Sequence, residues 1–141
     1  MAGFVRKGNH IYNCANKAYA ALKNGTFVEI GANGVVAITA DGDMEMKIVE
    51  KTYLWGKKAF VLDVIYEGTK DQYFLENEWC IKDDCTYDTS DYTCAVGDYV
   101  KMKRLQVGEQ IIMTVGDTEY AALSVGDIAI PSSGGSIEEK A

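Results

Sequence analysis

"LKNGTFVEIGANGVVAIT" at residues 22–39 contains a phrase that the chain repeats, and this phrase decides the fold. A hydrophobic residue stands three positions before a glycine, a polar residue follows the glycine, and strand-forming residues come next. The phrase returns as "CAVGDYVKM" at 94–102, "LQVGEQIIM" at 105–113 and "LSVGDIAI" at 123–130. Because glycine accepts the positive φ of a tight turn, each copy predicts a corner between two strands.

The hydrophobic residue of each copy is predicted to fill the end of a small barrel; these residues are Leu22, Cys94, Leu105 and Leu123. Repeating the corner would close an antiparallel barrel and remove its free strand edges. The phrase is not a phosphate loop, which needs several glycines and a following helix N-terminus. The sequence therefore predicts an all-β fold, a small antiparallel β-barrel.

The strands themselves are predicted from runs of β-branched, aromatic and alternating residues, at 26–30, 35–39, 44–49, 59–66, 73–75, 98–102, 110–115, 119–123 and 127–130. In 44–49, apolar and charged residues alternate, which predicts one face in water. The run 59–66 is apolar on both faces except for Asp63, so it is predicted to be the central strand. Residues 16–23 fit either a short helix or an extended segment.

The domain organisation follows from changes in composition along the chain. Residues 1–13 are predicted to be an extended N-terminal arm, and 14–131 the barrel domain. The stretch 67–94 is an inserted acidic, aromatic excursion from that barrel. After Pro131, glycine, serine and charge predominate, so 132–141 is predicted to be a flexible tail that folding does not need.

Length and charge narrow the classes of function. A chain of 141 residues fits one domain with a core of its own. Its formal net charge of −7 disfavours binding to nucleic acid or to an anionic membrane. No run of 18 apolar residues is present and the N-terminus lacks the apolar centre of a signal peptide, so synthesis in the cytoplasm is expected.

The chain offers few groups for metal binding or catalysis. Its single histidine, His10, and its four cysteines, Cys14, Cys80, Cys85 and Cys94, could supply zinc ligands, but the spacers do not match paired ligands. Reduced thiols are the preferred interpretation. The acidic residues of 41–45 and 83–91 could bind calcium, yet neither follows the twelve-residue loop pattern. We therefore expect no cofactor, no metal and no catalytic residue.

The phrase "NKAYAALKNGTFVEIGANGVVAIT" at 16–39, with "VGDYVKM" and "LSVGDIAIP" further on, resembles the head decoration (cement) proteins of tailed bacteriophages. Asn16-Lys17, Ala21-Leu22, the "GTFV" strand and the "GANG" turn carry the resemblance, which covers about a third of the chain. It implies a structural protein of the virion that stabilises the head and is made in the host cytoplasm. Its partner would be the major capsid protein.

Under this interpretation the chain would bind the outer surface of the mature capsid in many copies, as a homo-oligomer on the capsid lattice. The arm concentrates apolar and basic residues in an acidic protein, and tryptophan is frequent at interfaces. The predicted contact residues are Phe4, Val5, Arg6, Lys7, Ile11, Tyr12, Trp55 and Trp79. In water the arm should be disordered until a partner orders it. The alternatives are a carbohydrate- or ligand-binding β module of an adhesion component, and a small enzyme.

Overall fold

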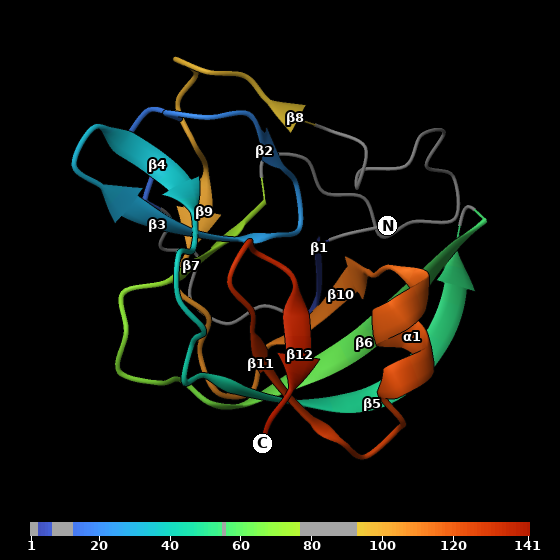
Figure 1. Cartoon of the computed structure of the whole chain (residues 1–141). Helices are drawn as coiled ribbons and strands as arrows, with labels where there is room; N and C mark the ends of the chain where they lie inside the picture. The colour runs from blue at the N-terminus through green and yellow to red at the C-terminus, as the bar shows by residue number, and fades with distance from the viewer. Residues whose placement is uncertain (1–2, 7–12, 55, 77–92) are drawn as a thin grey trace.

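The computed structural model describes residues 3–6, 13–54, 56–76 and 93–141. The fold is mostly β, with antiparallel sheets and one short helix (Figure 1). Figure 1 shows two groups of strands, with β2, β3, β4, β8 and β9 at the top left and β5, β6, β10, β11 and β12 below. The predicted predominance of antiparallel strands is confirmed.

The larger sheet has six strands in the order β1 (Gly3–Arg6), β10 (Gln110–Thr114), β6 (Lys57–Tyr66), β5 (Glu45–Leu54), β11 (Ile128–Pro131) and β12 (Ile137–Glu139). β6 lies between β10 and β5, so the prediction that 59–66 is an interior strand is confirmed. Its one polar interior residue, Asp63, accepts a hydrogen bond of 2.8 Å from the amide of Gln110 on β10. This contact satisfies the carboxylate that interrupts the apolar run.

The smaller sheets contain the remaining strands: β4 (Gly34–Ala37), β3 (Phe27–Gly31), β7 (Tyr73–Leu75) and β9 (Met102–Lys103) in one, and β2 (Leu22–Lys23) and β8 (Thr93–Cys94) in the other. The short strand predicted at 73–75 is β7, within the predicted excursion 67–94. Residues 16–23 are extended rather than helical, because Lys17 bridges to Tyr99 and Ala18 to Val35.

The buried apolar residues of the described chain form separate clusters. The main cluster combines residues of the six-stranded sheet with Phe27, Ile38 and Phe74 from the other side. The Phe27 and Phe74 rings lie 5.6 Å apart and tilted, a favourable aromatic arrangement. In β5 and just before it, Met44, Met46 and Ile48 are buried, which confirms the predicted alternation. A second cluster around Val28, Leu75 and Met102 fills the smaller sheets.

The repeated phrase forms the same corner in every copy. All four glycines have positive φ: 79° at Gly25, 89° at Gly97, 95° at Gly108 and 97° at Gly126. The hydrophobic residue three positions earlier is buried in each copy, as predicted. In the last three copies the residue after glycine donates its N–H to the carbonyl three positions back, at 3.0 to 3.1 Å. These are the hydrogen bonds of a tight turn that needs glycine at its third position.

Each corner also forms backbone hydrogen bonds with one residue of a distant segment. Two backbone hydrogen bonds hold this residue. The glycine N–H donates to its carbonyl, and its own N–H donates to the carbonyl of the residue that follows the glycine. The eight bonds measure 2.8 to 3.1 Å and join Gly25 to Leu75, Gly97 to Ala18, Gly108 to Val64 and Gly126 to Ile48. The four residues bound in this way are all buried, so these hydrogen bonds attach each turn to the core.

The prediction of a strand over 119–123 was wrong, because α1 (Asp117–Ala122) occupies this segment. Two alanines favour a helix, and Asp117 and Glu119 lie in its positive first turn. The Tyr120 ring stacks on Phe60 at 5.6 Å, while Leu123, one position beyond the helix, is buried. Tyr120 and Leu123 are three positions apart, and both pack in or against the main core cluster.

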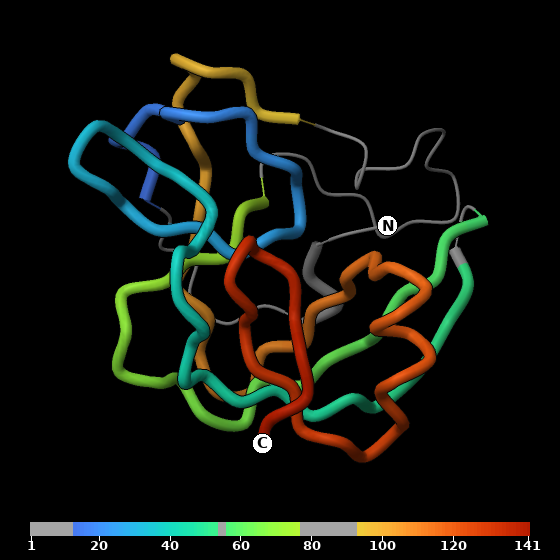
Figure 2. The backbone as a smooth tube through the Cα atoms, in the orientation of Figure 1, coloured from blue at the N-terminus to red at the C-terminus, as the bar shows by residue number. Residues whose placement is uncertain are grey.

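The prediction of a flexible tail over 132–141 was also wrong. β12 pairs with β11, and Ile137 is buried in the main core. Figure 2 shows this segment, in red, running through the middle of the molecule. The carbonyl of Gly135 accepts the N–H of Phe27 at 2.9 Å, and Gly134 donates to the carbonyl of Ile38 at 2.9 Å. The segment after Pro131 therefore joins the two groups of strands.

Candidate functional site

The predicted contact residues fall into two sets. Three of them, Phe4, Val5 and Arg6, lie in β1. The other five, Lys7, Ile11, Tyr12, Trp55 and Trp79, lie outside the described residues, as do His10, Cys80, Cys85 and the acidic set 83–91. The expected disorder of the arm is corrected for the four residues of β1, because the isolated chain already pairs them with β10.

β1 is the outermost strand of the six-stranded sheet. It pairs antiparallel with β10, with Gly3 opposite Ile112, Phe4 opposite Ile111 and Arg6 opposite Gln110. The register shifts between Phe4 and Arg6. Among the described strands, β10 is the only neighbour of β1, so one edge of β1 has its backbone groups directed away from this sheet. Such an edge can accept a strand from another chain.

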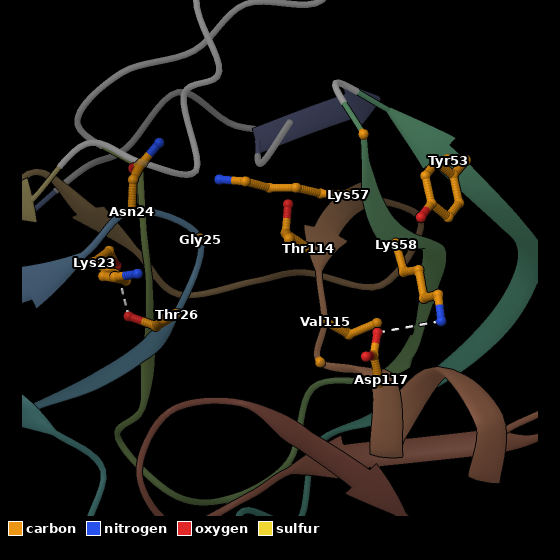
Figure 3. A pocket seen from close by; sticks show the side chains of 12 residues that line it. Lys23, Asn24, Gly25, Thr26, Tyr53, Lys57, Lys58, Thr114, Val115 and Asp117 are labelled. Atoms are coloured by element: carbon orange, nitrogen blue, oxygen red, sulfur yellow. Dashed lines mark hydrogen bonds and ion pairs between the residues drawn. The ribbon is translucent and has the colours of Figure 1, made fainter.

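A cleft of about 440 Å³ lies between the two groups of strands (Figure 3). One wall is the first corner, Lys23–Thr26, and the other comprises Thr114–Asp117 at the end of β10. Tyr53 and the segment Gly56–Lys58, at the turn from β5 to β6, complete the lining. The cleft therefore brings together residues that are far apart in the sequence.

The charged side chains of the cleft are mostly cationic. Among the described residues, Lys23, Lys57 and Lys58 line it together with one acidic residue, Asp117. Lys58 forms an ion pair of 3.2 Å with Asp117, whose side chain is 91% exposed. In Figure 3 the Lys57 side chain extends across the cleft from β6 toward Asn24. The described lining thus contains more basic than acidic side chains, in an acidic chain.

The neutral lining is polar. Asn24 is buried at the first corner, and the hydroxyl of Thr26 donates to the carbonyl of Lys23 at 2.7 Å. The Oγ1 atom of Thr114 is buried and has no hydrogen-bond partner among the described residues. A buried hydroxyl without a partner is uncommon and costs free energy. Local sequence patterns gave no sign of this cleft, since its lysines and polar residues belong to separate strands.

Of the residues considered as zinc ligands, only two cysteines lie within the described residues. Cys14 is exposed and Cys94 is buried, and both are free thiols. In the described ranges, no group of three or more histidine, cysteine or carboxylate side chains could hold a metal ion. The Sγ atom of Cys94 lies 3.8 Å from the carbonyl of Tyr99, a weak contact typical of a packed thiol.

The acidic residues 41–45 bind neighbouring loops instead of gathering around one point. Asp41 accepts the N–H of Ser133, Asp43 accepts the N–H and hydroxyl of Thr69, and Glu45 pairs with Lys140. Hydrogen bonds from the Thr69 side chain and backbone lower the pKa of Asp43, since they favour the charged carboxylate. The backbone N–H of Ser133 lowers the pKa of Asp41, while a hydrogen bond with Asp41 raises that of Glu138.

Asp43 should therefore contribute stability that depends on pH. Because its folded pKa lies below the unfolded value, this contribution is present above the unfolded pKa and is lost as pH falls through the folded pKa. Asp43→Asn should lower the melting temperature at pH 7, and the difference from the parent chain should vanish in strong acid. Melting curves from neutral to strongly acidic pH test this, with exposed Glu139→Gln as control. A difference that does not change with pH would contradict it.

Within the described part of the chain, no helix is both long and apolar enough to cross a bilayer. Comparisons of the sequence with protein-family models and with curated proteins, and of the fold with solved structures, gave no match.

Proposed function

We propose that this chain is a bacteriophage head decoration protein that binds the outside of the mature capsid in many copies. The proposal includes the closure of its sheets into a small barrel and the assembly of copies on the capsid lattice through the major capsid protein. The similarity of residues 16–39 and of the later corners to this family supports the proposal. The repeated glycine corners, each hydrogen-bonded to a buried residue, also support the proposal.

The observation that carries the proposal is the edge position of β1. A segment rich in apolar and basic residues forms the last strand of a sheet and has one described neighbour, β10. Backbone groups on such an edge bind an extended segment of another protein through strand addition, with side chains adding specificity. Where neighbouring copies also bind one another on the lattice, each bound copy gains further contacts at high effective concentration, which tightens its attachment.

Two variants test this function. Deleting residues 1–6 should leave a folded chain, because β10 still pairs with β6 along its full length. Phe4→Pro should act similarly, since proline removes the backbone N–H opposite Ile111 and disrupts strand pairing. Both variants should bind undecorated heads at least about tenfold more weakly than the parent chain, because each lattice contact contributes to the total affinity.

The measurement is cosedimentation with phage heads stripped of the protein, with bound copies counted per head at increasing chain concentration. Circular dichroism shows whether each variant is folded. Lys47→Gln, on the exposed side of β5, is the matched surface control and should bind as the parent chain does. If the parent chain does not saturate heads, the decoration function is wrong. If the deletion variant binds as tightly as the parent, β1 is not the anchor.

A ligand-binding β module would need an aromatic platform on one sheet face. The exposed tyrosines of the β5–β6 hairpin do not provide one: Tyr53 lies opposite Lys58, while Tyr66 lies opposite Glu45 at the other end of the hairpin. Exposed Tyr19 and Tyr99 belong to the segments around β2 and the second corner. The described tyrosines thus give no support to a ligand-binding platform.

A further inference from the structure

We propose that Asn33 is a site of spontaneous covalent modification, at which the side-chain amide is lost and aspartate or isoaspartate is formed. Two Asn-Gly pairs occur in the chain, Asn24-Gly25 and Asn33-Gly34. Glycine has no side chain that would block the approach of the preceding asparagine to the glycine nitrogen. Both pairs therefore meet the sequence requirement, and their surroundings in the fold determine which one reacts. This inference does not depend on the proposed capsid function.

The reaction needs only groups of the chain itself and water. The backbone nitrogen of Gly34 attacks Cγ of Asn33, so that an N–Cγ bond forms and the Cγ–Nδ2 bond breaks. The amide nitrogen leaves as ammonia and takes the proton of the Gly34 N–H. Water then opens the succinimide ring: attack at Cγ breaks the new bond and gives aspartate, whereas attack at the main-chain carbonyl carbon breaks the original peptide bond and gives isoaspartate. Neither step needs an oxidant, a metal or an enzyme.

The turn between β3 and β4 leaves Asn33 open to this reaction. Ala32 and Asn33 form the turn, and both are exposed, so water reaches the amide. The turn lies at the left edge of the molecule in Figure 1. Gly31 and Gly34 form the last pair of the β3–β4 ladder, and the end of a ladder opens at a lower free energy than its interior. The turn therefore provides both the solvent and the backbone freedom that ring closure needs.

The fold also requires glycine at position 34. Gly34 has a φ of +142°, and a Cβ atom added there would lie 2.7 Å from the carbonyl oxygen of Lys17. Any side chain at this position would therefore be strained, whatever its polarity. A larger residue, which would slow the attack on Asn33, is thus excluded by the packing of the turn against the segment around Lys17.

The same dipeptide at the first corner is held closed. Asn24 is 3% exposed. The Gly25 N–H, whose nitrogen would have to attack, donates to the carbonyl of Leu75 at 2.8 Å, and the Leu75 N–H donates to the carbonyl of Thr26 at 2.9 Å. Reaction at Asn24 requires these bonds to break, so it should be at least about tenfold slower than reaction at Asn33.

Isoaspartate at position 33 should weaken the contact of β4 with the segment 17–19. It adds one atom to the main chain of the turn, two positions before buried Val35. The Val35 N–H donates to the carbonyl of Lys17, and the Val35 carbonyl accepts the N–H of Tyr19, both at 2.9 Å. A shift of β4 strains both bonds. The isoaspartate form should therefore melt at a lower temperature than the unmodified chain.

The test is incubation of the folded full chain at mildly alkaline pH for several weeks, followed by digestion and mass spectrometry. Cleavage after lysine and glutamate separates the two sites, because Asn24 falls in the fragment 24–29 and Asn33 in 30–45. We expect the mass increase of an amide-to-acid change in 30–45, with two chromatographic forms for aspartate and isoaspartate. The fragment 24–29 should remain unchanged. In guanidinium chloride both fragments should react at similar rates, because the fold no longer protects Asn24.

Asn33→Gln is the matched control, since it keeps an exposed amide but lengthens the side chain, so attack would have to form a larger ring. Its fragment 30–45 should keep its mass. After incubation the parent chain should melt at a lower temperature than Asn33→Gln treated in the same way, and equal melting temperatures would overturn the effect assigned to isoaspartate. If 30–45 of the folded parent chain keeps its mass, or if 24–29 reacts as fast as 30–45 in the folded chain, the proposal is wrong.

Discussion

Lys103→Met is expected to lower the free energy of unfolding by about 3 to 5 kcal/mol, because it leaves a buried carboxylate without its partner. Lys103 on β9 and Glu109 at the third corner form an ion pair of 2.7 Å, with 2% and 1% of their side chains exposed. The same Glu109 oxygen accepts the N–H of Gln106 at 2.7 Å. The pair therefore links the third corner to β9 in the interior.

The double variant Lys103→Met/Glu109→Leu should recover much of this loss, because replacing both charges removes the cost of their desolvation. Lys140→Met is the control: its ion pair with Glu45 is partly exposed and should contribute at most about 1 kcal/mol. Urea unfolding at neutral pH measures all three variants. A loss below about 1 kcal/mol for Lys103→Met would mean that water reaches the pair.

Ile137→Ala should lower the free energy of unfolding by about 2 to 5 kcal/mol, the usual cost of truncating a buried aliphatic side chain. Ile137 is 2% exposed and packs in the main core, although only four residues follow it in the sequence. Removing residues 134–141 should cost more, because it also deletes β12 and the two hydrogen bonds to Phe27 and Ile38.

Glu139→Ala is the control for this prediction, since Glu139 is an exposed residue on the same strand and should change stability by no more than about 0.5 kcal/mol. Thermal and urea unfolding of the truncated chain measure the effect. Unfolding of the truncated chain at the same temperature as the full chain would show that the C-terminal segment is dispensable after all.

Local periodicity was enough to predict most strands. Alternation around Met46 and the apolar run of β6 report which side chains avoid water, and that preference acts over a few neighbouring residues. The glycines of the repeated phrase were predictable for the same reason, since a tight turn depends on the φ of one residue. Buried Leu105 and Leu123 followed from their fixed distance to those glycines.

Two of the wrong predictions, the strand over 119–123 and the flexible tail, arose where distant contacts outweigh local preference. Tyr-Ala-Ala-Leu at 120–123 fits a strand or a helix, and the stacking of Tyr120 on Phe60 accompanies the helix. The segment after Pro131 contains one strongly apolar residue, Ile137, too little for a pattern. It is ordered because its backbone bonds to β3 and to the segment after β4, which no local signal in 132–141 reports.

The sequence by itself determined that the chain is antiparallel β with glycine corners, because these properties depend on residues close together in the chain. Only the tertiary structure decided which residue each corner is hydrogen-bonded to and which strands lie at the edges of the six-stranded sheet. It also decided that Lys23 and Lys57 line the same cleft. A periodic pattern shows which side of a strand is buried. It does not show which of the other apolar strands pairs with that strand or packs against it. The choice among them depends on the packing of the whole chain.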